Sequence, residues 1–87
     1  MKIAKIARAG SAESNDILIM ISPADTIEIE LDSVVKKQYG DDILRVIKET
    51  LKDLDVEGAK IVAEDKGALD FTIRARVKAA VLRGADI

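Results

Sequence analysis

Residues 26–32, Thr-Ile-Glu-Ile-Glu-Leu-Asp, alternate strictly between apolar and acidic side chains after the opening threonine. A period of two places the three apolar side chains on one face of a β-strand and Glu28 and Glu30 on the other. The segment therefore predicts a strand with one buried face and one wet face. Such a strand belongs in a sheet that is covered on one side only.

Two further segments have the character of strands. The continuous apolar run Ile17 to Ile21 is short and bounded by polar residues, which is typical of a buried strand. Residues 22–25, Ser-Pro-Ala-Asp, then form a short connection, so we expect residues 17–21 and 26–32 to pair as an antiparallel hairpin. A third strand is expected at residues 59–65.

Two helices complete the predicted pattern. Apolar residues recur at three- and four-residue spacings after Asp41 and Asp42, and again from about Leu69 to Arg83. Residues 33–40 could either extend the preceding strand or begin the first helix. The expected order is β-β-α-β-α. We predict a small two-layer α+β sandwich, in which a mixed three-stranded sheet carries two helices on one face. Residues 1–87 would form a single domain, with a folded core over 17–83 and a flexible N-terminal segment over 1–16.

The composition excludes several classes of function. The chain has no cysteine and no histidine, so it can build neither a thiolate site nor a Ser-His-Asp triad, and we expect no metal site and no catalytic residues. Its 14 basic and 16 acidic residues show no basic stripe typical of nucleic-acid binding. The longest apolar run is too short to cross a membrane, and the N-terminus lacks the apolar core of a secretory signal, so we expect a cytoplasmic protein.

Two serines are candidates for covalent modification. Ser33 lies in Asp-Ser-Val-Val, which superficially resembles the Asp-Ser-Leu motif that carries phosphopantetheine in the common acyl carrier proteins. Those domains are all-helical bundles, whereas this Asp-Ser pair closes a predicted strand, so Ser33 fits a strand end or a helix cap better. Ser14 lies in the polar run Gly-Ser-Ala-Glu-Ser-Asn-Asp at residues 10–16, which taken alone is an ordinary turn.

Three sequence blocks distinguish Ser14 from an ordinary turn serine. Residues 9–23, AGSAESNDILIMISP, are followed by VVKKQYGDDI at 34–43 and by DKGALDFTIRARVKAAVLR at 65–83. In this order they are similar to the acyl carrier protein of citrate lyase, the γ subunit of that complex. The chain resembles this family over about residues 9 to 83, and the third block is the most specific.

The resemblance implies a role for Ser14. In this family the matching serine carries a phosphoribosyl-dephospho-coenzyme A group through a phosphodiester link, attached by a separate transferase. The arm would hold acetyl and citryl thioesters while the α subunit transfers the acyl group and the β subunit cleaves citryl thioester, so that citrate yields acetate and oxaloacetate. Glu13 and Asp16 flank the attachment point, where they would either dock partner proteins or form solvated loop charge.

Other residues and other functions stay open at this point. We expect Asp65 and Asp70 to cap a helix start, and Arg74 and Arg76 either to lie in solvent or to bind the phosphates of the arm. The nearest alternative function is a carrier of the malonate decarboxylase type, with the same kind of group on a serine. Further alternatives are a phosphopantetheine carrier modified at Ser33 and an interaction module without a covalent group.

Overall fold

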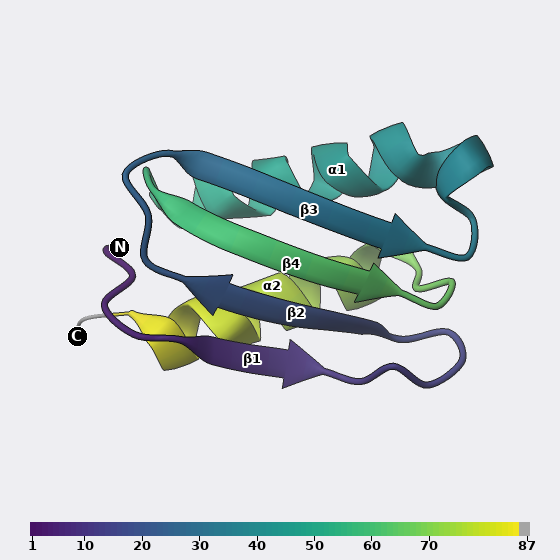
Figure 1. The fold of residues 1–87 in the computed structure, drawn as a ribbon, viewed down its shortest axis with the longest axis horizontal. Helices are drawn as coiled ribbons and strands as arrows, with labels where there is room; N and C mark the ends of the chain where they lie inside the picture. Colours follow the sequence, from purple (N-terminus) through teal and green to yellow (C-terminus); the bar gives the residue numbers. More distant parts are fainter. Residues whose placement is uncertain (86–87) are drawn as a thin grey trace.

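The computed structural model describes residues 1–85, which form a four-stranded mixed sheet with two helices on one face (Figure 1). The elements are β1 (Ala7–Gly10), β2 (Ile17–Ser22), β3 (Ile27–Ser33), α1 (Lys36–Asp53), β4 (Ala59–Asp65) and α2 (Asp70–Gly84). The strands lie in the order β1-β2-β4-β3. Strand β2 pairs antiparallel with β1 and β4, whereas β3 and β4 are parallel. The predicted α+β sandwich is confirmed.

The hydrophobic core lies between the sheet and the helices. Side chains of the central strand β4 alternate between buried and half-buried, so one face of the strand points to the helices. Helix α1 connects the parallel strands β3 and β4, as a parallel pair requires a long crossover. The largest fully buried apolar side chains come from both layers: Ile17, Ile19, Ile21, Val46, Ile47, Leu51, Ile61, Ile73, Val77 and Val81.

The sequence analysis missed strand β1. It lies within residues 1–16, which were expected to be flexible, and it pairs with β2 from Ala7 opposite Ile21 to Gly10 opposite Leu18. Its four residues, Ala-Arg-Ala-Gly, have low β-propensity, and the alternation of two small alanines with Arg8 and Gly10 is too short and too weakly apolar to predict a strand. The strand therefore forms because β2 offers a free edge and α2 packs against it, which a local pattern does not reveal.

The predicted hairpin was wrong, because β4 lies between β2 and β3. Inserting a strand separates β2 from β3 by two strand spacings, about 10 Å. The connection at 23–26 is long enough to span that distance, since each residue extends up to about 3.5 Å. Strand β4, whose side chains are all buried or half-buried, takes an interior position with a neighbour on each edge. Glu28 and Glu30 are exposed as predicted, and their strand β3 lies at the edge of the sheet.

Helix α1 begins earlier than the apolar spacing suggested. It starts at Lys36 rather than near Asp41, and its first turn contains no acidic residue. The first turn, residues 36–39, is exposed and so lacks the apolar stripe on which the prediction relied. The earlier start brings Tyr39 close to the end of the sheet at which β3 and β4 terminate.

Candidate functional site

The polar loop at residues 11–16 joins β1 to β2 at the end of the sheet where β3 and β4 finish. Gly10 enters the loop with φ +87°, and Asn15 adopts φ +66°. A Cβ atom at position 10 would collide with the carbonyl oxygen of Ile17. The reversal between the two strands therefore requires glycine here.

Ser14 lies exposed near the tip of this loop. Within the described residues, its hydroxyl makes no hydrogen bond, whereas the backbone beside it is held firmly. The Asn15 amide donates to the carbonyl of Lys66 at 2.8 Å, and the Lys66 amide donates to the carbonyl of Asp16 at 2.9 Å. The loop thus presents a free primary hydroxyl on a fixed backbone, next to Glu13, which is also exposed.

Asp16 points inward and fixes the loop to helix α2. Arg76 donates from Nε and Nη2 to the two carboxylate oxygens of Asp16, at 3.0 and 3.2 Å. The Ser11 hydroxyl donates to Asp16 at 2.8 Å, and the Ile17 amide donates at 2.7 Å. Hydrogen bonds from Arg76, then from Ser11 and Ile17, lower the pKa of Asp16 from 3.8 to about 2. The side chain is only 16% exposed, so its visible role is to position the loop.

A second carboxylate, this one fully buried, organises the neighbouring turns. Asp65, expected to cap a helix, instead ends β4 and is 1% exposed. It accepts hydrogen bonds from the Gly67 and Ala68 amides at 3.2 and 3.0 Å and from the Ser33 hydroxyl at 2.6 Å. The sequence signal that could have revealed this role is an aspartate directly before a Lys-Gly turn.

Ser33, the alternative attachment serine, is engaged within the fold. Its hydroxyl donates to Asp65 and accepts from the Val35 amide at 3.1 Å, which fixes the step from β3 into α1. The mixed sheet also differs from the all-helical bundle on which the phosphopantetheine alternative depends. That alternative is therefore wrong.

The remaining candidate residues lie apart from Ser14. Asp70 is the first residue of α2, and no side chain caps that helix start, so the predicted cap at Asp70 is absent from the described structure. Arg74 donates to Glu49 of α1 at 3.2 Å rather than facing the loop. Arg76 is the one of the two arginines that the fold brings to the site, through its bond with Asp16.

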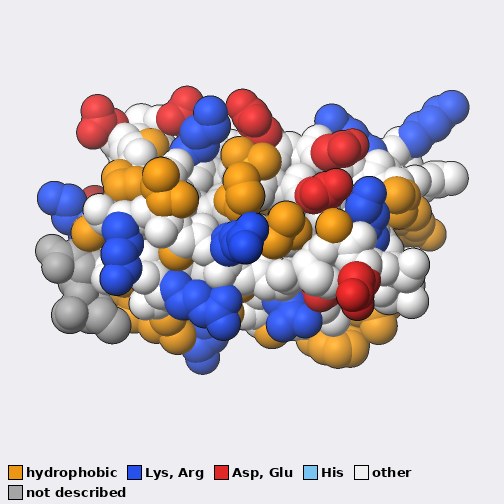
Figure 2. All heavy atoms as spheres, turned by 60° about the horizontal axis from the view of Figure 1, so that its bottom comes forward, with side chains coloured by type: hydrophobic (Ala, Val, Ile, Leu, Met, Phe, Trp, Pro, Cys, Tyr) orange, Lys and Arg blue, Asp and Glu red, His pale blue; other side chains and the backbone are white. Residues whose placement is uncertain are grey.

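The edge strand β1 carries one cationic side chain, that of Arg8, and lies next to Arg83 of α2. Arg83 of α2 donates from Nη1 to the carbonyl of Arg8 at 2.8 Å, which ties the helix to the strand. Figure 2, turned so that the β1 edge comes forward, shows Lys and Arg side chains across the middle of this face. A short edge strand that carries a charged residue is a poor template for pairing, so the length of β1 and Arg8 both disfavour edge-to-edge association.

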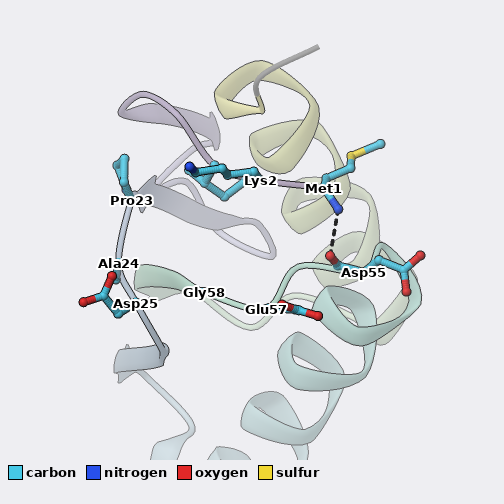
Figure 3. A pocket seen from close by; sticks show the side chains of 9 residues that line it. Met1, Lys2, Pro23, Ala24, Asp25, Asp55, Glu57 and Gly58 are labelled. Atoms are coloured by element: carbon cyan, nitrogen blue, oxygen red, sulfur yellow. Dashed lines mark hydrogen bonds between the residues drawn. The ribbon is translucent and has the colours of Figure 1, made fainter.

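Two hollows of comparable size lie at opposite ends of the sheet. One, of about 640 Å³, is bounded by the N-terminus and by the connections around Pro23 and Glu57 (Figure 3). There the Met1 ammonium group donates to the carbonyl of Asp55 at 2.7 Å. The other, of about 570 Å³, lies between α1 and α2 at the end that holds Ser14. Among residues 1–85, no group of three or more acidic side chains is arranged to hold a metal ion.

Comparisons with known proteins place this fold in a family. A family model described as "Malonate decarboxylase delta subunit (MdcD)", of the acyl carrier type, matches residues 4–84. The citrate lyase acyl carrier protein of Cronobacter sakazakii is 53% identical over 87 residues, and that of Haemophilus ducreyi is 50% identical over 86. Each alignment covers 99% of this chain and 90% of the relative.

A solved structure shares the fold at much lower identity. A chain of a Pseudomonas malonate decarboxylase hetero-tetramer in complex with malonate superimposes with a TM-score of 0.80 at 14% identity, over 98% of this chain and 93% of that one. None of the helices among the described residues is long and apolar enough to span a bilayer. These relatives are about half identical to the chain, and the alignments cover 99% of it and 90% of each of them. They decide the family: this chain belongs to the citrate lyase acyl carrier proteins.

Proposed function

We propose that this chain carries a phosphoribosyl-dephospho-coenzyme A arm on Ser14 and serves as the non-catalytic carrier subunit of citrate lyase. The observation that supports this most directly is the contrast within one loop. The Ser14 hydroxyl is exposed and unbonded among the described residues, while Asp16, Lys66 and Arg76 hold the backbone around it. A modifying enzyme needs this combination, because it must reach the hydroxyl without first unfolding the loop.

The residues at the loop fit the proposed group. Attachment replaces the Ser14 hydroxyl proton by the phosphorus of the arm: the serine oxygen forms the new P–O bond, and the activated donor loses its phosphate-type leaving group. The proton passes to a base of the transferase, since no side chain near Ser14 in the described residues is bonded to its hydroxyl. The small neighbours Ala12 and Asn15 leave room for a bulky substituent.

The bound arm would supply a terminal thiol that holds acyl groups as thioesters. Because the arm is tethered, both partner active sites would meet the thioester at a raised effective concentration. We expect the partners to be the acyl transferase (α) and citryl lyase (β) subunits. The exposed Glu13, beside the attachment point, is the acidic residue positioned to meet a basic surface on one of them or on the transferase.

Reconstitution tests this function. The chain that carries the arm, here called the loaded chain, is expected to cleave citrate when mixed with the α and β subunits of a related citrate lyase. The Ser14→Ala variant, treated with the same transferase and donor, is expected to be inactive. Ser33→Ala is the matched control and should retain activity. Activity of the Ser14→Ala variant equal to that of the wild type would overturn the assignment.

A malonate decarboxylase type of carrier remains a second candidate. The matching family model carries that description, and the Pseudomonas chain shares the fold. The two candidates differ in their partners, so the loaded chain should also be mixed with the remaining malonate decarboxylase subunits. Support of malonate decarboxylation but not of citrate cleavage would favour this second function.

A further inference from the structure

The hollow between α1 and α2 contains an exposed aromatic side chain that the fold does not use. Tyr39 is 56% exposed although it lines this hollow, and Leu69 on the opposite wall is 63% exposed. Ile43 and Ile73 form the base between them and are buried. Large apolar side chains left in solvent beside a concave surface are typical of a binding site.

The hollow is connected directly to the loop that holds Ser14. Lys66 exchanges backbone hydrogen bonds with Asn15 and Asp16, and the next residue, Gly67, lines the hollow. A Cβ atom at Gly67 would lie 3.7 Å from the Asn15 side-chain oxygen. The wall of the hollow and the support of the loop are therefore one segment, and a group attached to Ser14 starts beside the opening.

The charges around the hollow indicate which portion of an arm attached to Ser14 could bind there. Asp42 and Asp70 lie at its rim, and Arg45, the cation among its described lining residues, bonds Glu49 at 2.7 Å and lies 3.9 Å from Asp42. Two carboxylates disfavour phosphate but accept hydrogen bonds from amino groups. A neutral, flat ring with an exocyclic amine and a face to stack on Tyr39 fits better than any charged portion of the arm.

We propose that the adenine ring of the Ser14-linked arm stacks on Tyr39 in this groove, so that the arm rests on its own carrier between reactions. The inference depends on the proposed function, because it requires the arm to be attached at Ser14. Stacking of a base on an aromatic side chain favours the stacked state by roughly tenfold. Most loaded molecules would then have Tyr39 covered, while the arm would still leave easily for a partner's active site.

The chain provides its own reporter for this contact. Tyr39 is the only tyrosine and there is no tryptophan, so intrinsic emission reports on this groove alone. The mass of the protein is measured first to establish that the arm is present. Loaded chain is expected to emit less than unloaded chain when folded, and the two should emit equally in urea, where Ser14 and Tyr39 separate.

Amide chemical shifts locate the contact and supply the control. Attachment of the arm should change the amide chemical shifts of residues 67–73 as well as those of the loop. In the Tyr39→Ala variant, attachment should no longer change the chemical shifts of residues 67–73. Phe71→Ala is the matched control and should preserve them, because Phe71 is 71% exposed on the same helix end but does not line the groove.

Three outcomes would overturn the proposal. Equal Tyr39 emission in loaded and unloaded folded chain, with shifts confined to 10–17, means that the arm moves freely. Emission that falls only after partner subunits are added means that the groove receives a partner instead. A chain that gains no mass at Ser14 refutes the attachment itself, and with it this docking.

Discussion

The ion pair between Asp16 and Arg76 should contribute measurably to stability, and its contribution can be worked out from the site. The pKa of Asp16 falls from 3.8 to about 2, and each unit corresponds to about 1.4 kcal/mol in favour of the charged form in the folded state. Without any allowance for solvent screening, the shift corresponds to about 2.5 kcal/mol of folding free energy. The Arg76 side chain is 42% exposed, so solvent screening reduces the value. We expect Asp16→Asn to destabilise the fold by about 1–2 kcal/mol at pH 7.

Urea unfolding of a double-mutant cycle measures this pair. Asp16→Asn, Arg76→Gln and the double variant should be non-additive, because either single change already removes the interaction. Arg74→Gln is a suitable control, since Arg74 pairs with Glu49 and lies away from the loop. Strict additivity of the two changes would refute the reasoning.

The same pair predicts a pH dependence. The folded-state pKa of Asp16 is depressed, so its stabilising contribution is complete above the unfolded value of 3.8 and is lost as the pH falls towards about 2. The stability difference between wild type and Asp16→Asn should therefore shrink between about pH 4 and pH 2. A difference that stays constant through this window would show that Asp16 contributes by some other means than its charge.

Further changes test the geometry around the loop. Gly10→Ala should destabilise the fold by more than about 1 kcal/mol, through its positive φ and the collision with Ile17, as measured by urea unfolding. Asp65→Ala should cost about 2–4 kcal/mol, because it leaves two part-buried amides and a part-buried hydroxyl without their acceptor; a loss below about 0.5 kcal/mol would contradict the role of Asp65. Ser14→Ala should change the melting temperature very little, since the hydroxyl bonds nothing within the described residues.

Local patterns predicted the parts of this fold that depend on local chemistry. The alternation at Glu28 and Glu30 identified a strand with a wet face, and residues 59–65 form β4 as expected. Strand β1 was missed because its residues favour no strand by themselves. The strand order was missed because a short connection permits both a hairpin and an inserted strand.

The candidate site follows the same division: its local features were predictable from the sequence, whereas its long-range contacts were not. Ser14 could be singled out from sequence because the family motif surrounds it, and its exposure follows from the small polar residues of the loop. Asp16 could not be recognised as a support, because its partner Arg76 lies 60 residues away and nothing in the sequence pairs them. Asp65 was misassigned for the same reason, since its bond to Ser33 exists only once β3 and β4 lie side by side.

Intact mass and peptide mapping of the protein purified from its native host, from cells that contain active citrate lyase, test the central claim most directly. Our account predicts a phosphoribosyl-dephospho-coenzyme A adduct on the peptide that contains Ser14, and none on the peptide that contains Ser33. An unmodified chain from such cells, or an adduct located anywhere other than Ser14, would contradict it.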